Sequence, residues 1–506
     1  MTTTVEVKAR QADIGEPPPF AYREVAAVTA LAAIALFASI GRYGFFGDEM
    51  YFVAAGRRLA LGYADQGVLV PAIARVMDVL APGSLVALRI PAVLVTLAAV
   101  VISALIAREM GGSRAAQVLT ATAYATSTFL LVQGTVLATN TIDTALWVLI
   151  TWLLIRWVRT RRDGLLLWAG VATAIDMQVK WLIPFFWISV AVAVLLAGPR
   201  EMLRRPALWA GAAISVAVTV PTLIWQAARG WPQLGMGAAV SHEQDSIGGR
   251  YTFVPIALIA AGVLGAMLLT VGVFALLRAP ALRPWRFIGL VLLFLVVLFV
   301  ITNGRPYYAV GCYAAVIAAG AVWWTRDAAR WRAIVAIVLS VVSAAVVIFT
   351  LPWQPESTIE PVESDTQAGL SIGLYGKFGW PELRDGAAAA YRALPEPERS
   401  RAVIIADSYW QASALDVERE KYGLPAVYSP NRGFGYFGTP PDSATTVLWI
   451  GGKEADVRAL FGTVTPIGRV DARLGIPELA RDVTIWRCDQ PRTPWSQSWK
   501  GMLRLN

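Results

Sequence analysis

The sequence predicts a polytopic α-helical membrane protein with about eleven transmembrane helices and a small C-terminal α/β domain outside the membrane. The 506-residue chain is 56% apolar and only 16% charged, whereas soluble domains carry roughly 25% charged residues. Many of its apolar runs approach or exceed the roughly 20 residues that a helix needs to cross a bilayer. After Leu351 the sequence becomes richer in proline and charge, and no further run of that length follows.

The apolar runs place the predicted spans at 25–41, 85–106, 114–132, 143–159, 165–178, 181–197, 207–224, 253–277, 287–302, 307–324 and 333–351. Two kinds of loop alternate between these spans. Short, basic loops lie at 108–114, 156–162, 200–205, 278–286 and 326–332, and longer or acidic loops at 41–84, 132–142, 225–252 and 303–306. Basic loops mark the cytoplasmic side. The alternation therefore predicts a cytoplasmic N-terminus, and it explains the net charge of +9 without a nucleic-acid partner.

The two ends of the chain differ in character. Residues 1–24 are polar and read as a cytoplasmic tail, whereas residues 25–351 form the membrane domain. Within 352–506, strands are expected at 402–406, 446–450 and 483–486, with helices at 408–422 and 454–461. Strands that alternate with helices predict a small α/β domain, residues 352–506, outside the membrane. The two cysteines, Cys312 and Cys488, provide no disulfide framework or metal site.

The most informative stretch is Gly47-Asp48-Glu49-Met50-Tyr51, at the outer end of the first span. Adjacent carboxylates beside a membrane helix are costly to desolvate, which favours a chemical role. An ordinary solvated loop is the alternative. The segments 49–61 and 67–80, which follow in the first outer loop 41–84, are amphipathic but too short to cross. We expect both to be helices lying in the membrane interface, with Arg57, Arg58 and Arg75 near lipid headgroups, and a plain loop is again the alternative.

Two cations are predicted on the same outer face. Lys180 lies between two predicted spans. Arg305 lies in a loop predicted to be outside, although positively charged residues are usually found in cytoplasmic loops. Each alone is typical of a structural anchor, but with Asp48 and Glu49 they outline a site in which acids and cations are separated. That arrangement suits sugar transfer from a lipid phosphate, because a carboxylate can take the acceptor proton while cations hold the departing phosphate.

Two further polar groups have open interpretations. Asn140 and Asp143 lie at the start of a span, where they either cap the helix or contact substrate. His242, Glu243 and Asp245 include the only histidine and are either ligands for a divalent cation or part of a mobile polar loop. We expect no required cofactor and no metal site beyond these three candidate ligands.

Several motifs resemble those of family 39 glycosyltransferases, membrane enzymes of the GT-C fold that include protein O-mannosyltransferases and lipid A aminoarabinose transferases. The similarity begins with residues 47–51, continues through 58 and 61–65, and recurs in order at 140–143, 180 and 304–308. It covers most of 40–440. It implies a polyprenyl-phosphate-linked sugar as donor. We therefore expect an integral cell-membrane glycosyltransferase that transfers this sugar, with inversion at the anomeric carbon, to a hydroxyl of an extracytoplasmic lipid, polysaccharide or protein.

The resemblance also implies residue roles. Asp48 would be the catalytic base with Glu49 supporting it, and the donor phosphate would lie near Lys180, Arg305 and Tyr307 or Tyr308. The family match extends to a set of candidate substrate-binding residues, namely Arg58, Tyr63, Asp65, Asn140 and Asp143. Tyr409-Trp410-Gln411 and Tyr436-Phe437, expected to be exposed on the outer domain, are candidates for positioning the acceptor.

Two positions depart from the family pattern. After Asp65 the family has a His-Pro-Pro-Leu type run, whereas this chain has Gln66-Gly67-Val68-Leu69. Asp176 stands where apolar residues are usual, and we expect it to pair with Lys180 four residues later.

Two other functions compete with sugar transfer. A lipid-linked saccharide transporter or flippase with an appended outer domain would also need cations for phosphate, although transporters bind near the membrane midplane. A non-catalytic assembly protein that binds cell-wall polymer is the second alternative.

Overall fold

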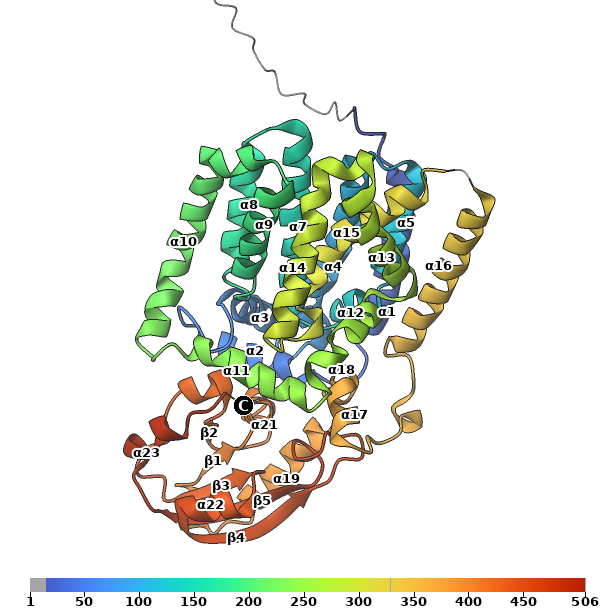
Figure 1. Ribbon diagram of the computed structural model, residues 1–506. Coiled ribbons are helices and arrows are strands. Elements are labelled where there is room, and N and C mark those ends of the chain that lie inside the picture. The colour runs from blue at the N-terminus through green and yellow to red at the C-terminus, as the bar shows by residue number, and fades with distance from the viewer. Residues whose placement is uncertain (1–14, 328, 506) are drawn as a thin grey trace, which may run out of the picture.

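The computed structural model describes residues 15–327 and 329–505, as a helical bundle with a smaller domain at one end (Figure 1). Residues 1–14 of the predicted tail lie outside the described part. The bundle contains α1 (Tyr22–Ser39), α4 (Leu85–Glu109), α5 (Arg114–Ala125), α6 (Thr128–Gln133), α7 (Thr139–Thr160), α8 (Gly164–Asp176), α9 (Ile183–Ala197), α10 (Pro206–Ala227), α12 (Phe253–Ala261), α13 (Val263–Arg278), α14 (Arg286–Ile301), α15 (Tyr313–Trp324) and α16 (Arg330–Thr350).

Among the described residues, seven helices are long and apolar enough to cross a membrane, or eight if the bent pair α12 and α13 is one span. Helices α8 and α9 are apolar but shorter. The protein is therefore a polytopic membrane protein as predicted, while the count of eleven spans stays a prediction. Two predicted spans are not continuous helices, because 114–132 divides into α5 and α6, and 253–277 bends by 112° between α12 and α13.

The two broken spans meet at their breaks. Gly262 lies between α12 and α13 with φ +74°, and a Cβ there would stand 2.7 Å from the carbonyl oxygen of Thr126, between α5 and α6. The Ser127 hydroxyl donates to the carbonyl of Ala260 at 2.7 Å. Carbonyls freed by a helix break need a donor in an apolar environment. The close approach of these segments supplies one, and it requires a residue without a side chain at 262.

The C-terminal domain is built on a five-stranded sheet with the order β2-β1-β3-β5-β4. Its strands are β1 (Val403–Ala406), β2 (Val427–Tyr428), β3 (Thr446–Ile450), β4 (Phe461–Val470) and β5 (Val483–Pro491), and its longer helices are α19 (Trp380–Arg392), α21 (Tyr409–Val417), α22 (Glu454–Leu460) and α23 (Trp495–Met502). Strand β1 is parallel to β2 and β3, whereas β5 is antiparallel to β3 and β4. The three predicted strands are confirmed.

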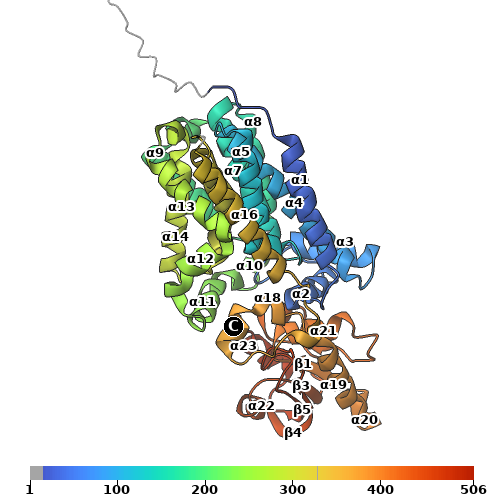
Figure 2. The ribbon, with the colours of Figure 1, turned by 90° about the vertical axis from the view of Figure 1, so that its right-hand side faces the viewer.

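Two short helices, α2 (Gly47–Gly56) and α3 (Leu69–Leu80), confirm the helical prediction for the first outer loop. Their predicted place beside lipid headgroups is wrong for α2, since nearly all of it is buried against α21 of the C-terminal domain. Figure 2 shows α2 between the bundle and that domain. At its start, a Cβ on Gly47 would lie 2.1 Å from the Trp410 ring, so only glycine allows this approach.

The two arginines after α2 form ion pairs with carboxylates of this protein. Arg57 pairs with Asp78 of α3 at 2.8 Å. Arg58 makes a two-pronged ion pair with Asp416 of α21, at 2.6 and 2.8 Å. The Arg58–Asp416 pair, together with a hydrogen bond from Arg57 to the carbonyl of Val417 at 2.7 Å, attaches the C-terminal domain to the loop 41–84.

Candidate active site

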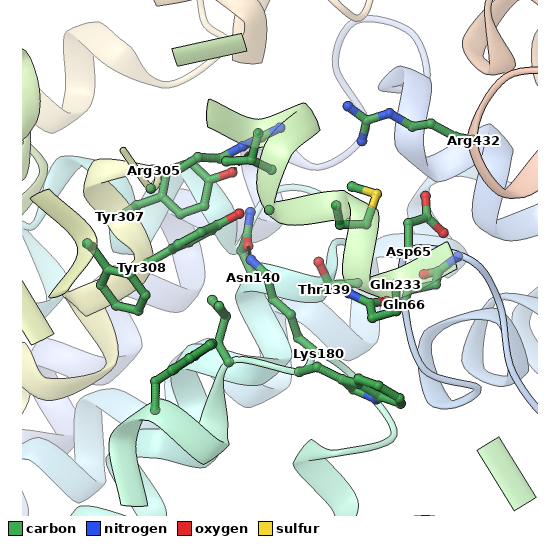
Figure 3. Close-up of a pocket in the computed structure, with 18 of the residues that line it drawn as sticks. Asp65, Gln66, Thr139, Asn140, Lys180, Gln233, Arg305, Tyr307, Tyr308 and Arg432 are labelled. Carbon is green, nitrogen blue, oxygen red and sulfur yellow. Dashed lines mark hydrogen bonds between the residues drawn. The ribbon is translucent and has the colours of Figure 1, made fainter. Parts of the chain in front are cut away.

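A cavity of about 430 Å³ lies between the end of the bundle next to the C-terminal domain, the helix α11 (Pro232–Asp245) and that domain. Figure 3 shows its polar side chains in two groups, with Arg305, Tyr307 and Tyr308 on one side and Asp65, Gln66 and Arg432 on the other. Further polar residues of the lining are Asp48, Tyr51, Thr139, Asn140, Lys180, Gln233 and Tyr409. The sequence-predicted residues Asp48, Asp65, Asn140, Lys180 and Arg305 thus share one cavity.

Asp48 stands in the first turn of α2, where the helix dipole favours a negative charge. Its Oδ1 accepts hydrogen bonds from the Tyr409 hydroxyl and from Trp410 Nε1, both at 2.7 Å. No hydrogen bond from the described residues reaches Oδ2, and the half-buried side chain lines the cavity. One oxygen is therefore held by two donors, while the other is open to a ligand.

Glu49 has a different environment. Its side chain is fully buried and pairs with the equally buried Arg89, at 2.8 and 2.7 Å. The same carboxylate accepts from the backbone N–H groups of Phe46 and Leu137, at 2.8 and 3.0 Å. Glu49 does not line the cavity. These contacts hold the first turn of α2, which carries Asp48, in place.

The acidic end of the cavity is formed by Asp65 and its neighbours. The Tyr51 hydroxyl donates to Asp65 Oδ1 at 2.8 Å. Burial raises the pKa of Asp65, and the nearby charge of Arg432 opposes this rise. Gln66, which replaces the histidine of the family pattern, is buried, and neither atom of its amide has a hydrogen-bond partner among the described residues. These groups offer donors and acceptors suited to sugar hydroxyls.

The cationic end is built around Lys180, in the break between α8 and α9. Its ammonium donates to Asn140 Oδ1 of α7 and lies 4.5 Å from the centre of the Tyr308 ring. Arg305 donates to the Tyr307 hydroxyl at 2.7 Å. Two cations and a phenol hydroxyl converge here, which suits an anion. The predicted ion pair between Asp176 and Lys180 does not form, because Asp176 is buried with both oxygens unpaired.

Arg432 is a site residue that the sequence analysis missed. It enters the cavity from the C-terminal domain, and its guanidinium lies 5.0 Å from the Tyr409 ring centre. Glu243 of α11 forms ion pairs with both Arg432 and Arg305. This carboxylate therefore links the cationic end to the outer domain. No local pattern marks Arg432, since it follows an unremarkable loop far along the chain from Asp48.

The remaining predicted site residues lie outside the cavity. Arg58 is held by Asp416, and the buried Tyr63 donates to the carbonyl of Ala55 at 3.1 Å. Asp143 is buried in α7 behind the lining residues. Tyr63 and Arg58 therefore serve packing and domain attachment in this structure.

The candidate metal ligands do not form a cluster. His242 is exposed, Glu243 is engaged by two arginines, and Asp245 accepts from the Asn303 amide at 2.9 Å. In 15–327 and 329–505, no group of three metal-ligating side chains comes together.

Tyr409-Trp410-Gln411 and Tyr436-Phe437 of the C-terminal domain were expected to be exposed, and this is wrong for all five residues. Trp410 and Gln411 are buried in α21, and Tyr409, Tyr436 and Phe437 are half-buried. For α21 the reason is its docking on α2, which the sequence of either helix does not reveal. Tyr409 and Trp410 still reach the site, as ligands of Asp48.

Comparison with known proteins gives two results. The sequence model of the dolichyl-phosphate-mannose-protein mannosyltransferase family matches residues 65–225. The structure is similar to ArnT from Cupriavidus metallidurans in the apo state, with a TM-score of 0.61, 14% identity, and coverage of 92% of this chain and 98% of ArnT. Against ArnT bound to undecaprenyl phosphate the TM-score is 0.57, with 15% identity and coverage of 91% and 97%. No curated protein sequence matches the chain.

The match in 65–225 includes three residues of the cavity wall, Asp65, Asn140 and Lys180. The structural match spans the bundle and the outer domain together. The chain therefore has the GT-C fold of ArnT, and its residues 65–225 match the model of the dolichyl-phosphate-mannose-protein mannosyltransferase family.

Proposed function

We propose that the protein transfers a sugar from a polyprenyl-phosphate donor to a hydroxyl of an acceptor outside the cytoplasm, with inversion at the anomeric carbon. The observation that carries the proposal is the cavity itself, which holds an Asp48 carboxylate with one open oxygen together with the cations Lys180 and Arg305. A relative of the same fold, ArnT, binds undecaprenyl phosphate.

Asp48 acts as the general base in this proposal. The acceptor hydroxyl attacks the anomeric carbon, its proton passes to Asp48 Oδ2, and the new C–O bond forms. Tyr409 and Trp410 hold Oδ1, so the carboxylate cannot rotate freely away from the acceptor. A positioned base of this kind contributes roughly 10²- to 10⁴-fold to rate.

Lys180 and Arg305 bind and stabilise the phosphate leaving group. The bond between the anomeric carbon and the phosphate oxygen breaks, and its electron pair stays on the lipid phosphate. The Tyr307 hydroxyl, already bonded to Arg305, provides another donor to that oxygen. Positive groups in a water-poor site stabilise developing charge far more than they would in bulk water. We propose no requirement for a divalent cation, so treatment with EDTA is expected to leave transfer unchanged.

We further propose that the basic loops face the cytoplasm and the C-terminal domain faces outward. The basic loops lie at the end of the bundle opposite the C-terminal domain (Figure 1), as the positive-inside rule requires. The cavity then opens at the outer surface, where Arg432, Tyr409 and Trp410 join the membrane part of the site to the outer domain. This domain would position the acceptor.

Reconstituted vesicles separate transfer from transport. Full-length protein in vesicles would be given a radiolabelled polyprenyl-phosphate sugar and an envelope extract as acceptor. The proposal expects label in the acceptor fraction together with stoichiometric release of polyprenyl phosphate. Label that crosses the vesicle membrane while the donor lipid stays intact would instead establish a transporter.

A further inference from the structure

A second polar cavity, of about 400 Å³, lies on the other side of the start of α2. Its walls come from the loop after α1, the beginning of α19 and the loop after β4, with Tyr43, Gly44, Lys377, Gly379 and Arg473 among the lining residues. None of its lining residues lines the first cavity. It plays no part in the proposed transfer reaction.

Lys377 is the unusual group in this cavity. The residue is only 5% exposed, its ammonium keeps some access to the cavity, and no hydrogen bond or ion pair reaches that ammonium from any described residue. Burial and the neighbouring Arg89 lower the pKa of Lys377 to about 8, and Glu49 opposes this. A buried cation without a partner is costly, and such groups ordinarily have a counter-ion. The cavity beside the lysine is the space in which an anion would fit.

The rest of the wall adds positive potential. The exposed Arg473 guanidinium donates to the backbone carbonyls of Ile359 and Glu356, and no carboxylate of the described residues pairs with it. The 13-residue helix α19 also begins at the cavity, after Gly379, and a helix N-terminus favours anions.

The other charged side chains of the cavity wall are either paired or exposed. Arg384 is already paired with Glu418 at 2.7 Å. Glu356 and Glu382 also line the cavity, and both are exposed. Lys377 is therefore the buried cation of this wall that lacks a carboxylate partner among the described residues, whereas Arg473, Glu356 and Glu382 are exposed.

The position of the cavity, close to the predicted membrane surface, suggests which class of anion it binds. Tyr43 and Gly44 follow within a few residues of α1, a candidate span that ends at Ser39. Phosphate groups are concentrated at this depth, as lipid headgroups. We propose that the Lys377 cavity is a binding site for a phosphate group, distinct from the site of sugar transfer, in which Lys377 and Arg473 are the anion-binding side chains.

Two sources can supply that phosphate, a lipid headgroup or a free phosphate compound, and labelling of Lys377 distinguishes them. Full-length protein in maltoside detergent would be treated with an amine-acetylating reagent at pH 8, and the modification rates of Lys377 and of exposed Lys421 would be compared by mass spectrometry. The measurement is repeated with inorganic phosphate, with sodium chloride at equal ionic strength, and in phosphatidylglycerol vesicles.

Bound phosphate shields the amine, so the Lys377 rate falls by the factor 1 + [L]/Kd, or about tenfold at ten times Kd. Slowing by inorganic phosphate assigns the site to a free phosphate compound, and slowing only in the vesicles assigns it to a lipid headgroup. In either case Lys421 keeps its rate. Equal slowing by chloride, or no slowing of Lys377 relative to Lys421 under any condition, overturns the proposal.

The rise in Tm of two variants gives an independent test with whichever ligand slows the labelling of Lys377. Lys377→Gln is expected to lose the rise in Tm that the ligand gives the wild type, whereas the surface variant Lys421→Gln keeps it. A Lys377→Gln protein with an undiminished rise contradicts the assignment of Lys377. If this variant does not fold, the labelling of the wild-type protein still decides the proposal.

Discussion

Trp410 Nε1 donates a hydrogen bond to Asp48 Oδ1 at 2.7 Å, between residues 362 positions apart in the chain. The same indole ring packs against Gly47, at a distance that excludes any side chain there. The outer domain thus directly orients the carboxylate to which we assign the central role. With the hydrogen bond from the Tyr409 hydroxyl to the same oxygen, this contact links attachment of the domain to chemistry at Asp48.

Replacing Trp410 with phenylalanine removes the N–H group and keeps most of the ring. A hydrogen bond to a charged group is worth roughly 1.5–3 kcal/mol, so we expect kcat to fall roughly 10- to 100-fold while the protein stays folded. Steady-state transfer assays measure this. Trp449→Phe is the matched control, because the Trp449 indole N–H is buried without a partner. A Trp410→Phe enzyme no slower than this control would contradict the orienting role.

Glu49→Gln is expected to act on stability first. Breaking one partner of a buried ion pair costs about 3–5 kcal/mol, and Glu49 also accepts two backbone N–H groups. Denaturant unfolding in detergent should show this loss, whereas Glu382→Gln, at an exposed position, should change little. A Glu49→Gln protein with wild-type stability and no activity would instead support direct catalysis by Glu49.

Lys180→Met should weaken the interaction of the enzyme with the donor phosphate. The methionine fills similar volume without charge, so we expect kcat/KM for the lipid-linked donor to fall by on the order of 100-fold, equivalent to about 2.7 kcal/mol. Competition by free polyprenyl phosphate should weaken in parallel. Lys421→Met, on the surface of the outer domain, is the control. Unchanged competition by the lipid phosphate would show that Lys180 does not contact it.

Much of this site can be predicted from the sequence because its residues lie at helix starts or at the ends of apolar spans, which the sequence shows directly. Asp48 begins a short helix, and Lys180 and Arg305 follow apolar spans, so topology alone predicts a common face for them. The sequence predicts Asp48 as the base with Glu49 in support, but it does not show that Glu49 points away from the cavity and pairs with the buried Arg89.

The parts that were missed depend on contacts between distant segments. Burial of α2 requires the outer domain to cover it, and Arg432 reaches the cavity only because of that docking. The expected Asp176–Lys180 pair fails because the Asp176 carboxylate is buried and the Lys180 ammonium donates to Asn140 of α7 instead. Strand β4 was missed because most of its residues are exposed and polar or small, which leaves no apolar run.

Lys377 predicts a distinct dependence of stability on pH. Its folded pKa of about 8 lies below the ordinary lysine value of 10.5, so the unfolded chain binds more protons between these values. Stability from this group therefore rises from about pH 8 to 10.5 and is lowest below pH 8. In phosphate-free detergent, Lys377→Met should raise Tm at pH 7, and its advantage should shrink toward pH 10. A constant difference across that range would contradict the lowered pKa.

Transfer by Asp48→Asn tests the central claim most directly. The amide keeps the size of the side chain and cannot take a proton, so we expect transfer to fall by roughly 10²- to 10⁴-fold, with binding of the polyprenyl-phosphate donor retained. Asp385→Asn, at an exposed position of α19, should transfer as well as wild type. The measurement is label transferred from the radiolabelled donor to acceptor by equal amounts of folded protein. Wild-type transfer by Asp48→Asn would contradict the assignment of Asp48 as the base.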